Sequence, residues 1–498
     1  MKARSGVGMV AVLCSAVGCS SGLATAPVLE ISIVSPQPGS QYDVGDTIPI
    51  VVVPEDPAVT RMTVSFWAED RLIEVDSVPP YETRWATTED TPLRPLIKVQ
   101  ASDLPRGTAD RSVSVEVNWR YHRPPELGDG WPTATLEEAG LREAPLDSLV
   151  RALRAATGHL IHGIVIVRHG KLVFEKYFDG LSHPTFGEQP VSYGPETIHG
   201  LSSVTKSFTA TLLGVAIEKG CIGSVSDRVF DYFPDLEDLD VGLRSEITLE
   251  DLVTMRSGLQ WDEHTFPLTD ERNDLTAWLR RAASTSTDPA RDILQRAMVA
   301  TPGTVYNYAG GDTNVLGNAI QRACSQRLDR YARAVLFNPL GVQDAWWWVF
   351  PSDFVYASGD LALRPRDMAK LGQLYLQDGV WNGERILPPG WVEAATASVT
   401  SFLPSEGYEG VAGYGYGWWT LTDDYGAGAY EARGWGGQYI VVVPEYDMVV
   451  ALTAGAYWTP AWWDDDEIMT GFVLPAIVSR TAATPAPASS IDDAGSSG

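Results

Sequence analysis

The sequence predicts a chain of two folded domains, an all-β sandwich followed by an α/β domain built on an antiparallel sheet. The 498 residues exceed the length of one ordinary domain, and 44% of them are hydrophobic, which is enough for large buried cores. Short strand-like segments fill the first part of the chain. In the second part, two strand hairpins lie near the two ends and enclose helical segments.

The first residues have the pattern of an export signal. Lys2 and Arg4 give a basic start, residues 7–17 are small and apolar, and Cys19 ends a box similar to the cleavage site of bacterial lipoproteins. An apolar segment this short does not span a bilayer stably. We therefore expect residues 1–19 to be a lipoprotein signal peptide. Lipidated Cys19 would then attach the protein to a membrane of the cell envelope, in the periplasm or at the outer membrane; plain secretion is the alternative.

Cys221 and Cys324 remain once Cys14 and Cys19 are assigned to the signal. An oxidising compartment permits a disulfide between them, and two buried, unpaired thiols are the alternative. Sequence spacing does not bring two residues within bonding distance, so both readings stay open.

The formal net charge of −27 argues against a nucleic-acid partner, because phosphate binding needs clustered Lys and Arg. Such acidity is typical of a well-solvated exported surface. An adaptation to high salt or to cationic ligands is the alternative.

Residues 28–119 are predicted to fold as a separate β module. Loops with Pro and Gly separate its strands, and the module contains no Cys or His. Its length and strand spacing fit an immunoglobulin-like (Ig-like) sandwich, for which we expect a spacer or docking role. The strand segments are residues 31–34, 48–53, 62–67 and 113–117.

A linker is expected over residues 120–132, the second domain over 133–480 and a disordered tail over 481–498, which is rich in Ala, Pro, Ser and Gly. The second domain opens with an amphipathic helix over residues 146–156. Strands at both of its ends predict one antiparallel sheet with helices packed on it. The hairpin strands are residues 163–168, 171–175, 439–443 and 448–452.

The main chemical motif precedes a helical pattern that stops at Gly220. It reads Ser202-Ser203-Val204-Thr205-Lys206-Ser207-Phe208-Thr209. Ser203 is expected at the helix N-terminus, with Lys206 one turn later on the same face. The ammonium of Lys206 can lower the pKa of the Ser203 hydroxyl or, once neutral, accept its proton. An ordinary capped helix is the alternative, although no other lysine follows a serine by three positions.

Two further segments add candidate groups. In Tyr306-Asn307-Tyr308-Ala309-Gly310, a buried Tyr308 phenol beside Lys206 would have a lowered pKa and could serve as a general base. In Arg433-Gly434-Trp435-Gly436-Gly437-Gln438, the main-chain N–H of Gln438 could form an oxyanion hole with that of Ser203, worth roughly 3–4 kcal/mol per donor. Core packing by the tyrosines and a plain glycine-rich turn are the alternatives.

These three segments, in this order, resemble the superfamily of serine β-lactamases, penicillin-binding proteins and related esterases. Residues 247–259, which contain Ser257-Gly258-Leu259, and residues 366–372 add to the resemblance. The resemblance implies a β-lactamase/transpeptidase-like fold, in which the sheet domain lies beside an all-helical subdomain and the site lies between them. It also implies that Ser203, Lys206 and Tyr308 carry out acyl transfer.

Two departures from the β-lactamase pattern bear on the substrate. Gly310 stands where β-lactamases have Asn, and Trp435-Gly436-Gly437 stands where Lys or His followed by Thr-Gly is usual. These features are similar to class C-like esterases and 6-aminohexanoate-oligomer hydrolases. The expected substrate pocket contains Trp435, Gly436, Gly437, Gly310 and Tyr414. The neighbouring Tyr416, Trp418 and Trp419 would add an apolar wall, although core packing suits Trp418 and Trp419 better.

The sequence thus predicts a serine hydrolase that forms an acyl-enzyme with a small-molecule ester or amide. A β-lactamase or D-Ala-D-Ala carboxypeptidase is the first alternative, and a catalytically silent surface-binding protein is the second. An α/β-hydrolase is disfavoured because the Gly-x-Ser-x-Gly match lies at residues 18–22, inside the signal. The histidines show no His-x-x-x-His spacing, so no metal or cofactor is expected.

Overall fold

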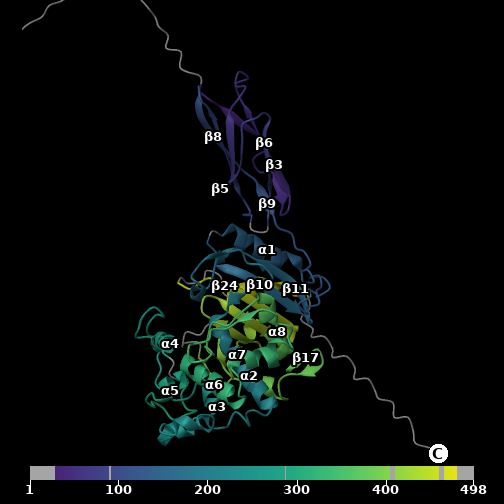
Figure 1. Ribbon diagram of the computed structural model, residues 1–498. Helices are drawn as coiled ribbons and strands as arrows, with labels where there is room; N and C mark the ends of the chain where they lie inside the picture. Colours follow the sequence, from purple (N-terminus) through teal and green to yellow (C-terminus); the bar gives the residue numbers. More distant parts are fainter. Residues whose placement is uncertain are drawn as a thin grey trace, which may run out of the picture. The chain divides into compact units, whose positions relative to one another are not determined.

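The computed structural model describes residues 28–88, 91–156, 158–285, 288–403, 410–458 and 465–478, and the chain divides into two compact units (Figure 1). The first unit comprises the residues up to Thr87 together with Arg94–Val117. The second comprises Thr88–Leu93 and everything from Asn118 onward. The signal over residues 1–19, with Cys19, and the tail over 481–498 lie outside the described residues. No helix in the described part of the chain is long and apolar enough to cross a membrane.

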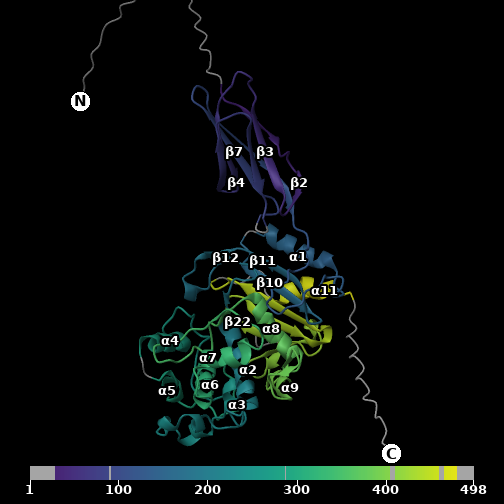
Figure 2. The ribbon, with the colours of Figure 1, turned by 45° about the vertical axis from the view of Figure 1, so that its right-hand side comes forward.

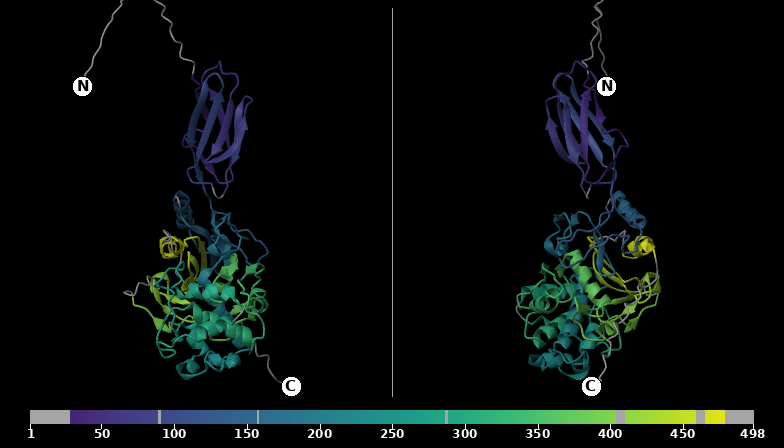
Figure 3. Two further views of the ribbon diagram at one scale, coloured as in Figure 1. Left: turned by 60° about the vertical axis from the view of Figure 1, so that its left-hand side comes forward. Right: turned by 90° about the vertical axis from the view of Figure 1, so that its right-hand side faces the viewer.

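The first unit is a β-sandwich, as predicted (Figure 3). Side chains alternate between buried and exposed along β3, β4 and β7, so each sheet turns one apolar face inward. Ile50, Val64, Phe66 and Val99 are at most 1% exposed in the shared core. One sheet has the order β5 (Arg71–Asp76), β4 (Thr63–Ala68), β7 (Leu96–Asp103), β8 (Gly107–Ser114). A second sheet has the order β1 (Ile31–Ser35), β3 (Thr47–Pro54), β6 (Tyr81–Ala86). A third consists of β2 (Gln41–Asp43) and β9 (Glu116–Asn118).

The second unit contains one eight-stranded antiparallel sheet that joins both ends of the domain, as predicted. The first hairpin pairs with the last because β10 lies beside β24, with Val165 opposite Ala451. Residues of β10 and β24 are buried throughout, which is expected for central strands covered on both faces. The order is β11 (Lys171–Tyr177), β10 (Ile161–Arg168), β24 (Met448–Ala454), β23 (Gln438–Val443), β22 (Tyr430–Gly434), β21 (Trp419–Leu421), β20 (Val411–Tyr414), β19 (Thr400–Ser401).

Helices cover this sheet on both sides, with α1 (Glu143–Ala155) on one side and α8 (Pro365–Leu376) on the other (Figures 1 and 2). Gly372 lets α8 lie close to the sheet, since a Cβ there would meet Val449 at 2.5 Å. The other elements are short: α9 (Trp391–Ala395), α10 (Asp465–Ile468), α11 (Leu474–Ala476), β12 (Gly180–Leu181), β13 (Pro190–Val191), β14 (His199–Gly200), β15 (Ala345–Trp346), β16 (Ala362–Leu363), β17 (Val380–Trp381) and β18 (Glu384–Arg385).

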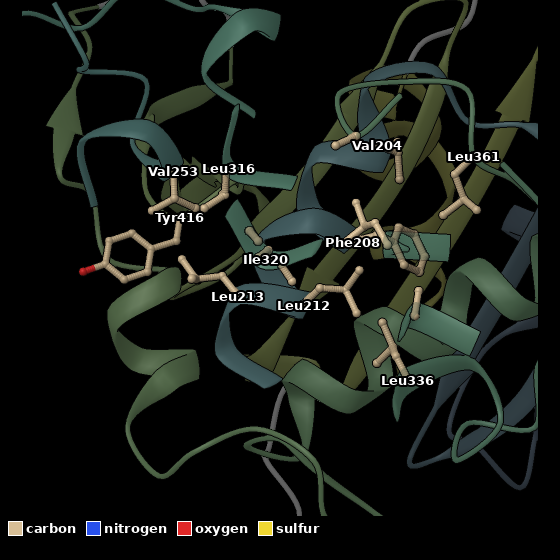
Figure 4. Packing of buried hydrophobic residues seen from close by; sticks show 14 of the residues in the cluster. Val204, Phe208, Leu212, Leu213, Val253, Leu316, Ile320, Leu336, Leu361 and Tyr416 are labelled. Atoms are coloured by element: carbon tan, nitrogen blue, oxygen red, sulfur yellow. The ribbon is translucent and has the colours of Figure 1, made fainter. Parts of the chain in front are cut away.

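The remaining helices pack mainly on α6, which contacts α2, α3, α5 and α7, and α2 is buried along almost its whole length. Figure 4 shows Leu213 of α2 among Val253 of α3 and Leu316 of α6, while Phe208 lies toward Leu336 and Leu361. A helix that is buried on all faces belongs inside a core, so α2 holds a fixed place in the domain. The helices are α2 (Thr205–Glu218), α3 (Leu249–Val253), α4 (Asp274–Ser284), α5 (Pro289–Leu294), α6 (Gly310–Ala323) and α7 (Leu328–Ala332).

The expected linker over residues 120–132 is instead packed into the second unit. Asp129 is 3% exposed and Trp131 is 4% exposed. The Trp131 indole donates a hydrogen bond to the Arg366 carbonyl (2.9 Å), and the Arg366 guanidinium binds Asp129 (2.9 Å). The Pro- and Gly-rich composition that indicated a linker therefore belongs to an irregular segment fixed by buried contacts.

Cys221 and Cys324 are free, half-buried thiols in the structure, so the disulfide considered from the sequence is not formed. Burial, followed by a hydrogen bond with the Cys221 thiol, raises the pKa of Cys324 to about 12. Cys324 therefore lies beside Cys221 and stays protonated at neutral pH, so little of its reactive thiolate is present.

Arg366 ties the segment before the sheet to the sheet itself. Its side chain is 0% exposed and binds Glu175 of β11 through two nitrogens (2.7 and 2.8 Å), in addition to Asp129. Removal of the guanidinium would leave two buried carboxylates without a cation, which costs about 3–5 kcal/mol.

We predict that Arg366→Ala lowers the free energy of unfolding of the second unit by about 3–5 kcal/mol. Arg151→Ala is the matched control, because that exposed arginine only pairs with Asp147 on the helix surface and should change stability by less than about 1 kcal/mol. Thermal and urea unfolding followed by circular dichroism measure both variants. Equal losses for the two arginines would contradict the role given to Arg366.

Candidate active site

Ser203 lies in the 3₁₀ turn Ser202–Val204, directly before α2. The Lys206 ammonium donates to Ser203 Oγ at 2.9 Å and to the Ser358 carbonyl at 3.0 Å. Lys206 is only 2% exposed, while Ser203 is half-buried and lines a cavity. The structure thus brings together the two residues that the i, i+3 spacing predicted as partners.

The turn that carries Ser203 is held in place by contacts with two other segments of the chain. Gly434, at the end of β22, passes so close that a Cβ there would meet the Leu201 carbonyl at 2.4 Å. On the other side, the Leu201 N–H donates to the Leu361 carbonyl at 2.8 Å. Ser202 has a φ of 46°, a left-handed conformation that a non-glycine residue keeps only where its surroundings fix it.

The second acceptor for Lys206 is also fixed by buried contacts. The Ser358 N–H donates to the Asn314 side chain (3.1 Å), and the Asn314 amide donates back to Ser358 Oγ (3.0 Å). Asn314 belongs to α6 and is 0% exposed. Helices α2 and α6 therefore hold the ammonium between two defined oxygen atoms.

Tyr308 lies in the loop before α6, with its ring over the Lys206 ammonium at 4.8 Å from the ring centroid. The ring stacks on Trp419 (centroids 5.7 Å apart), and Tyr414 contacts it edge-on (6.3 Å). Within the described residues, no hydrogen bond joins the Tyr308 hydroxyl to Ser203 or Lys206. Tyr308 is half-buried, so the phenol is less enclosed than the sequence suggested.

The segment around Ser257-Gly258-Leu259 supports the Tyr308 loop. The Asn307 N–H donates to the Met255 carbonyl at 2.8 Å. Ser257 Oγ donates to Asp312 of α6 at 2.7 Å, and burial raises the pKa of Asp312 to about 8. Asp312 is thus mainly protonated at neutral pH and fixes the start of α6 without adding a charge near Tyr308.

A cavity of about 830 Å³ opens beside Ser203 and Tyr308. Trp435, Gly436 and Gly437 line it, in agreement with the expected pocket. Gly436 has a φ of 87°, and a Cβ there would meet the Tyr457 ring at 2.2 Å, so this turn requires glycine. Other walls come from Phe266, Leu268, Leu275, Trp419, Tyr457 and Trp458.

Three of the expected site residues do not line the cavity. Tyr414 is 1% exposed and packs edge-on against Trp419 (4.8 Å), so it supports Tyr308 from behind and does not line the cavity. Gln438 is fully buried, and its side-chain amide donates to the Ala454 carbonyl (2.6 Å), so its main-chain N–H, which the oxyanion-hole prediction concerned, is the group left as a candidate. Gly310 is buried and offers only its N–H toward the cavity wall.

Of the remaining aromatic residues, Trp418 is buried in the core and Tyr416 is 7% exposed, with its hydroxyl bound to Glu250. Trp419 does reach the cavity, although the sequence favoured the core for it. Trp418 directly precedes β21 and Trp419 is its first residue; the first indole is buried in the core and the second reaches the site.

Arg433 lines the cavity, but acidic residues engage its guanidinium. It pairs with Glu431, which is 0% exposed, and with Asp465 at 3.7 Å. The side chain also lies over the Tyr439 ring. Its charge is therefore largely compensated within the protein.

Sequence reasoning missed Glu263, which also lines the cavity. Its Oε2 accepts the Gly310 N–H (2.7 Å) and the Trp261 indole N–H (2.6 Å). The position of Glu263 in the sequence could have suggested it, because Trp261-Asp262-Glu263 follows Leu259 almost directly. The spacing does not show, however, in which direction the Glu263 side chain points.

A second cavity of about 320 Å³ reaches Ser203 from the side of Ser202 and His183. His183 Nε2 lies 3.0 Å from Ser202 Oγ and 3.5 Å from Asp360. Burial lowers the pKa of His183 to about 4, and its Nδ1 accepts the Thr185 N–H, so the neutral ring carries its proton on Nε2. His183 therefore donates toward Ser202 and Asp360, and the group is not a base that activates Ser202.

No group of three or more His, Cys, Asp or Glu side chains in the described part of the chain could hold a metal ion. A serine hydroxyl in contact with a buried amine is an arrangement that can provide an activated nucleophile.

Comparisons with known proteins find relatives of both parts of the chain. A Beta-lactamase family model matches residues 146–461, and a bacterial Ig domain model matches residues 30–117. The chain is 26% identical over 268 residues to a 6-aminohexanoate-dimer hydrolase of Paenarthrobacter ureafaciens. That match covers 52% of this chain and 66% of the relative, just under two thirds of its length.

Solved structures show the same fold. A candidate 6-aminohexanoate-dimer hydrolase from Bacillus anthracis has a TM-score of 0.51 at 23% identity, over 69% of this chain and 85% of its own. A candidate β-lactamase from Bacteroides dorei has a TM-score of 0.52 at 17% identity, over 68% and 100%. Because the family model spans more than half of the residues, the chain belongs to the β-lactamase family of hydrolases and carries a bacterial Ig domain in front of its hydrolase domain.

Proposed function

We propose that this hydrolase forms an acyl-enzyme at Ser203 and acts on esters or amides, in preference to β-lactams. The observation that carries the proposal is the 2.9 Å contact between the Lys206 ammonium and Ser203 Oγ at the wall of the large cavity. A serine hydroxyl is a weak nucleophile unless a neighbouring group takes its proton, and Lys206 is the group in contact with it.

The proposed reaction proceeds in two halves. Lys206, in its neutral form, accepts the Ser203 proton as Oγ attacks the substrate carbonyl. The N-terminus of α2 and the main-chain N–H groups of Ser203 and Gln438 would stabilise the oxyanion. The proton then passes to the leaving alcohol or amine, with the Tyr308 hydroxyl as the candidate relay. Water, activated by the same groups, then hydrolyses the acyl-enzyme.

The amide side of the proposal is supported by the relative that is named as a 6-aminohexanoate-dimer hydrolase, since its name describes an amide substrate. The ester side is supported by the cavity walls, which are rich in aromatic and aliphatic side chains that suit neutral acyl or alkyl groups. β-Lactams carry a carboxylate that needs a cationic partner, and Arg433 is already paired with Glu431 and Asp465.

We predict that Ser203→Ala lowers kcat for p-nitrophenyl butyrate by at least about 10³-fold without loss of fold. Lys206→Ala and Tyr308→Phe should each be severely impaired, and neither should add to the loss in Ser203→Ala, because the three groups act as a unit. Tyr308→Phe keeps the ring over the ammonium and removes only the hydroxyl.

Steady-state kinetics with circular dichroism as the folding check measure these variants. Ser202→Ala and Tyr306→Phe are the neighbouring controls and should remain active. More than a few per cent of residual activity in Ser203→Ala would show that another group is the nucleophile.

We also predict that kcat/KM for p-nitrophenyl butyrate exceeds that for a chromogenic cephalosporin by about 10- to 100-fold, once both are corrected for intrinsic reactivity. The missing charge-assisted hydrogen bond to the carboxylate is worth about 1.5–3 kcal/mol. A cephalosporin rate equal to the ester rate would overturn the ester assignment and would mean that Arg433 leaves its acidic partners to bind substrate.

We propose further that the enzyme is exported and anchored by a lipid on Cys19. The bacterial Ig domain supports a location outside the cytoplasm, because such domains are typical of surface proteins. Intact mass spectrometry of membrane-extracted protein should find a mature chain that begins at Cys19 and carries acyl mass. Cys19→Ser should lose that mass while Cys14→Ser retains it; a mature chain that starts elsewhere without lipid would refute the anchor.

A further inference from the structure

A carboxylate forms part of the wall of the cavity that holds Ser203. Only one of its oxygens is engaged: Glu263 Oε2 accepts the N–H groups of Gly310 and the Trp261 indole, and no hydrogen bond to Oε1 is found among the described residues. A Cβ at position 310 would lie 3.0 Å from Oε2, so glycine permits this contact. The carboxylate is thus oriented from one side and leaves its other oxygen for a ligand.

Among the described residues, no cationic side chain is in contact with this carboxylate. None of the ion pairs in the described part of the chain includes Glu263. Arg433, the cationic side chain on the cavity wall, is bound by Glu431 and Asp465. Lys206 directs its ammonium to Ser203 and Ser358. The Glu263 carboxylate is therefore left on the cavity wall without an ion-pair partner.

The surroundings strengthen the effect of that charge. Phe266, Leu268 and Leu275 line the same cavity, and apolar walls lower the effective dielectric constant between a carboxylate and a bound cation. Trp419 and Trp435 also line the cavity, and indole rings attract ammonium groups. A cationic substrate would therefore be held by one ionic contact and by aromatic walls.

We propose that Glu263 binds a positively charged group of the substrate, so that the enzyme prefers esters or amides with an ammonium group on the chain that fills the larger cavity. This inference rests on the proposed acyl transfer at Ser203. The competing explanation is that Glu263 only caps the N-terminus of α6, where Gly310 is the first residue. The two explanations differ in what the charge of Glu263 does for different substrates.

The experiment compares two pairs of substrates that differ in charge but hardly in shape. The first pair places the charge in the acyl group: p-nitrophenyl 4-(trimethylammonio)butyrate and p-nitrophenyl 5,5-dimethylhexanoate. The second pair places it in the leaving group: butyrylthiocholine and S-(3,3-dimethylbutyl) thiobutyrate. We expect wild-type kcat/KM at low salt to favour the cationic member of one pair by about tenfold, and the preference to shrink at high salt.

Glu263→Gln tests the assignment, because an amide oxygen can still accept both N–H groups while the charge is lost. The preference should fall to about one, with the neutral substrate within about twofold of wild type. Glu393→Gln, at an exposed position on α9, removes the same charge elsewhere and should keep the preference. Should Glu263→Gln fold poorly, the wild-type preference and its salt dependence still decide the question.

Three results would overturn the inference: no cationic preference in either pair, a preference that survives in Glu263→Gln, or equal losses for all four substrates in that variant. The last would assign Glu263 to helix capping or to activation of the hydrolytic water. If the wild-type enzyme hydrolyses none of the four substrates, the proposed hydrolase activity itself fails, which is a different outcome from hydrolysis without charge preference.

Discussion

The burial of one ammonium group organises the site. Lys206 is 2% exposed, and a buried charge is tolerated only where hydrogen-bond acceptors replace water. Its acceptors are Ser203 Oγ and the Ser358 carbonyl, and the Tyr308 ring covers it at 4.8 Å. Each of these groups belongs to a different part of the chain, so helix α2, the loop before α6 and the segment before β16 must all meet at the ammonium.

The rest of the domain holds these segments in place around the Lys206 ammonium. The apolar surface of α2 fixes the helix in the core, and Gly434 lets β22 pass against the turn that carries Ser203. The ligand preference that we propose for the cavity beside Ser203 depends on which charged side chains of its wall have an ion-pair partner. Arg433 is paired and Glu263 is not, so the same cavity that lacks a partner for a carboxylate offers one for a cation.

Much of this architecture could be predicted from local pattern. The alternation of apolar and polar residues in short strands predicted the sandwich, and the two hairpins predicted the pairing of β10 with β24. Both predictions were possible because apolar periodicity and turn residues are visible within a few neighbouring positions. The Ser203–Lys206 contact followed from the i, i+3 geometry of a helix. The direction of Glu263, the burial of Tyr414 and the packing of Asp129 and Trp131 depend on contacts between distant segments, which periodicity does not encode. The same limit applies to Cys221 and Cys324, which are neighbours without being bonded.

The central claim is that Ser203 is the nucleophile, and peptide mapping of a covalent adduct tests it most directly. The full chain would be treated with a fluorophosphonate, digested and sequenced by tandem mass spectrometry, with heat-unfolded protein as the control. The account predicts a single adduct on Ser203 that forms only on the folded protein and is strongly reduced in Lys206→Ala. An adduct on Ser202 or another residue, or labelling of folded protein no faster than unfolded protein, would contradict it.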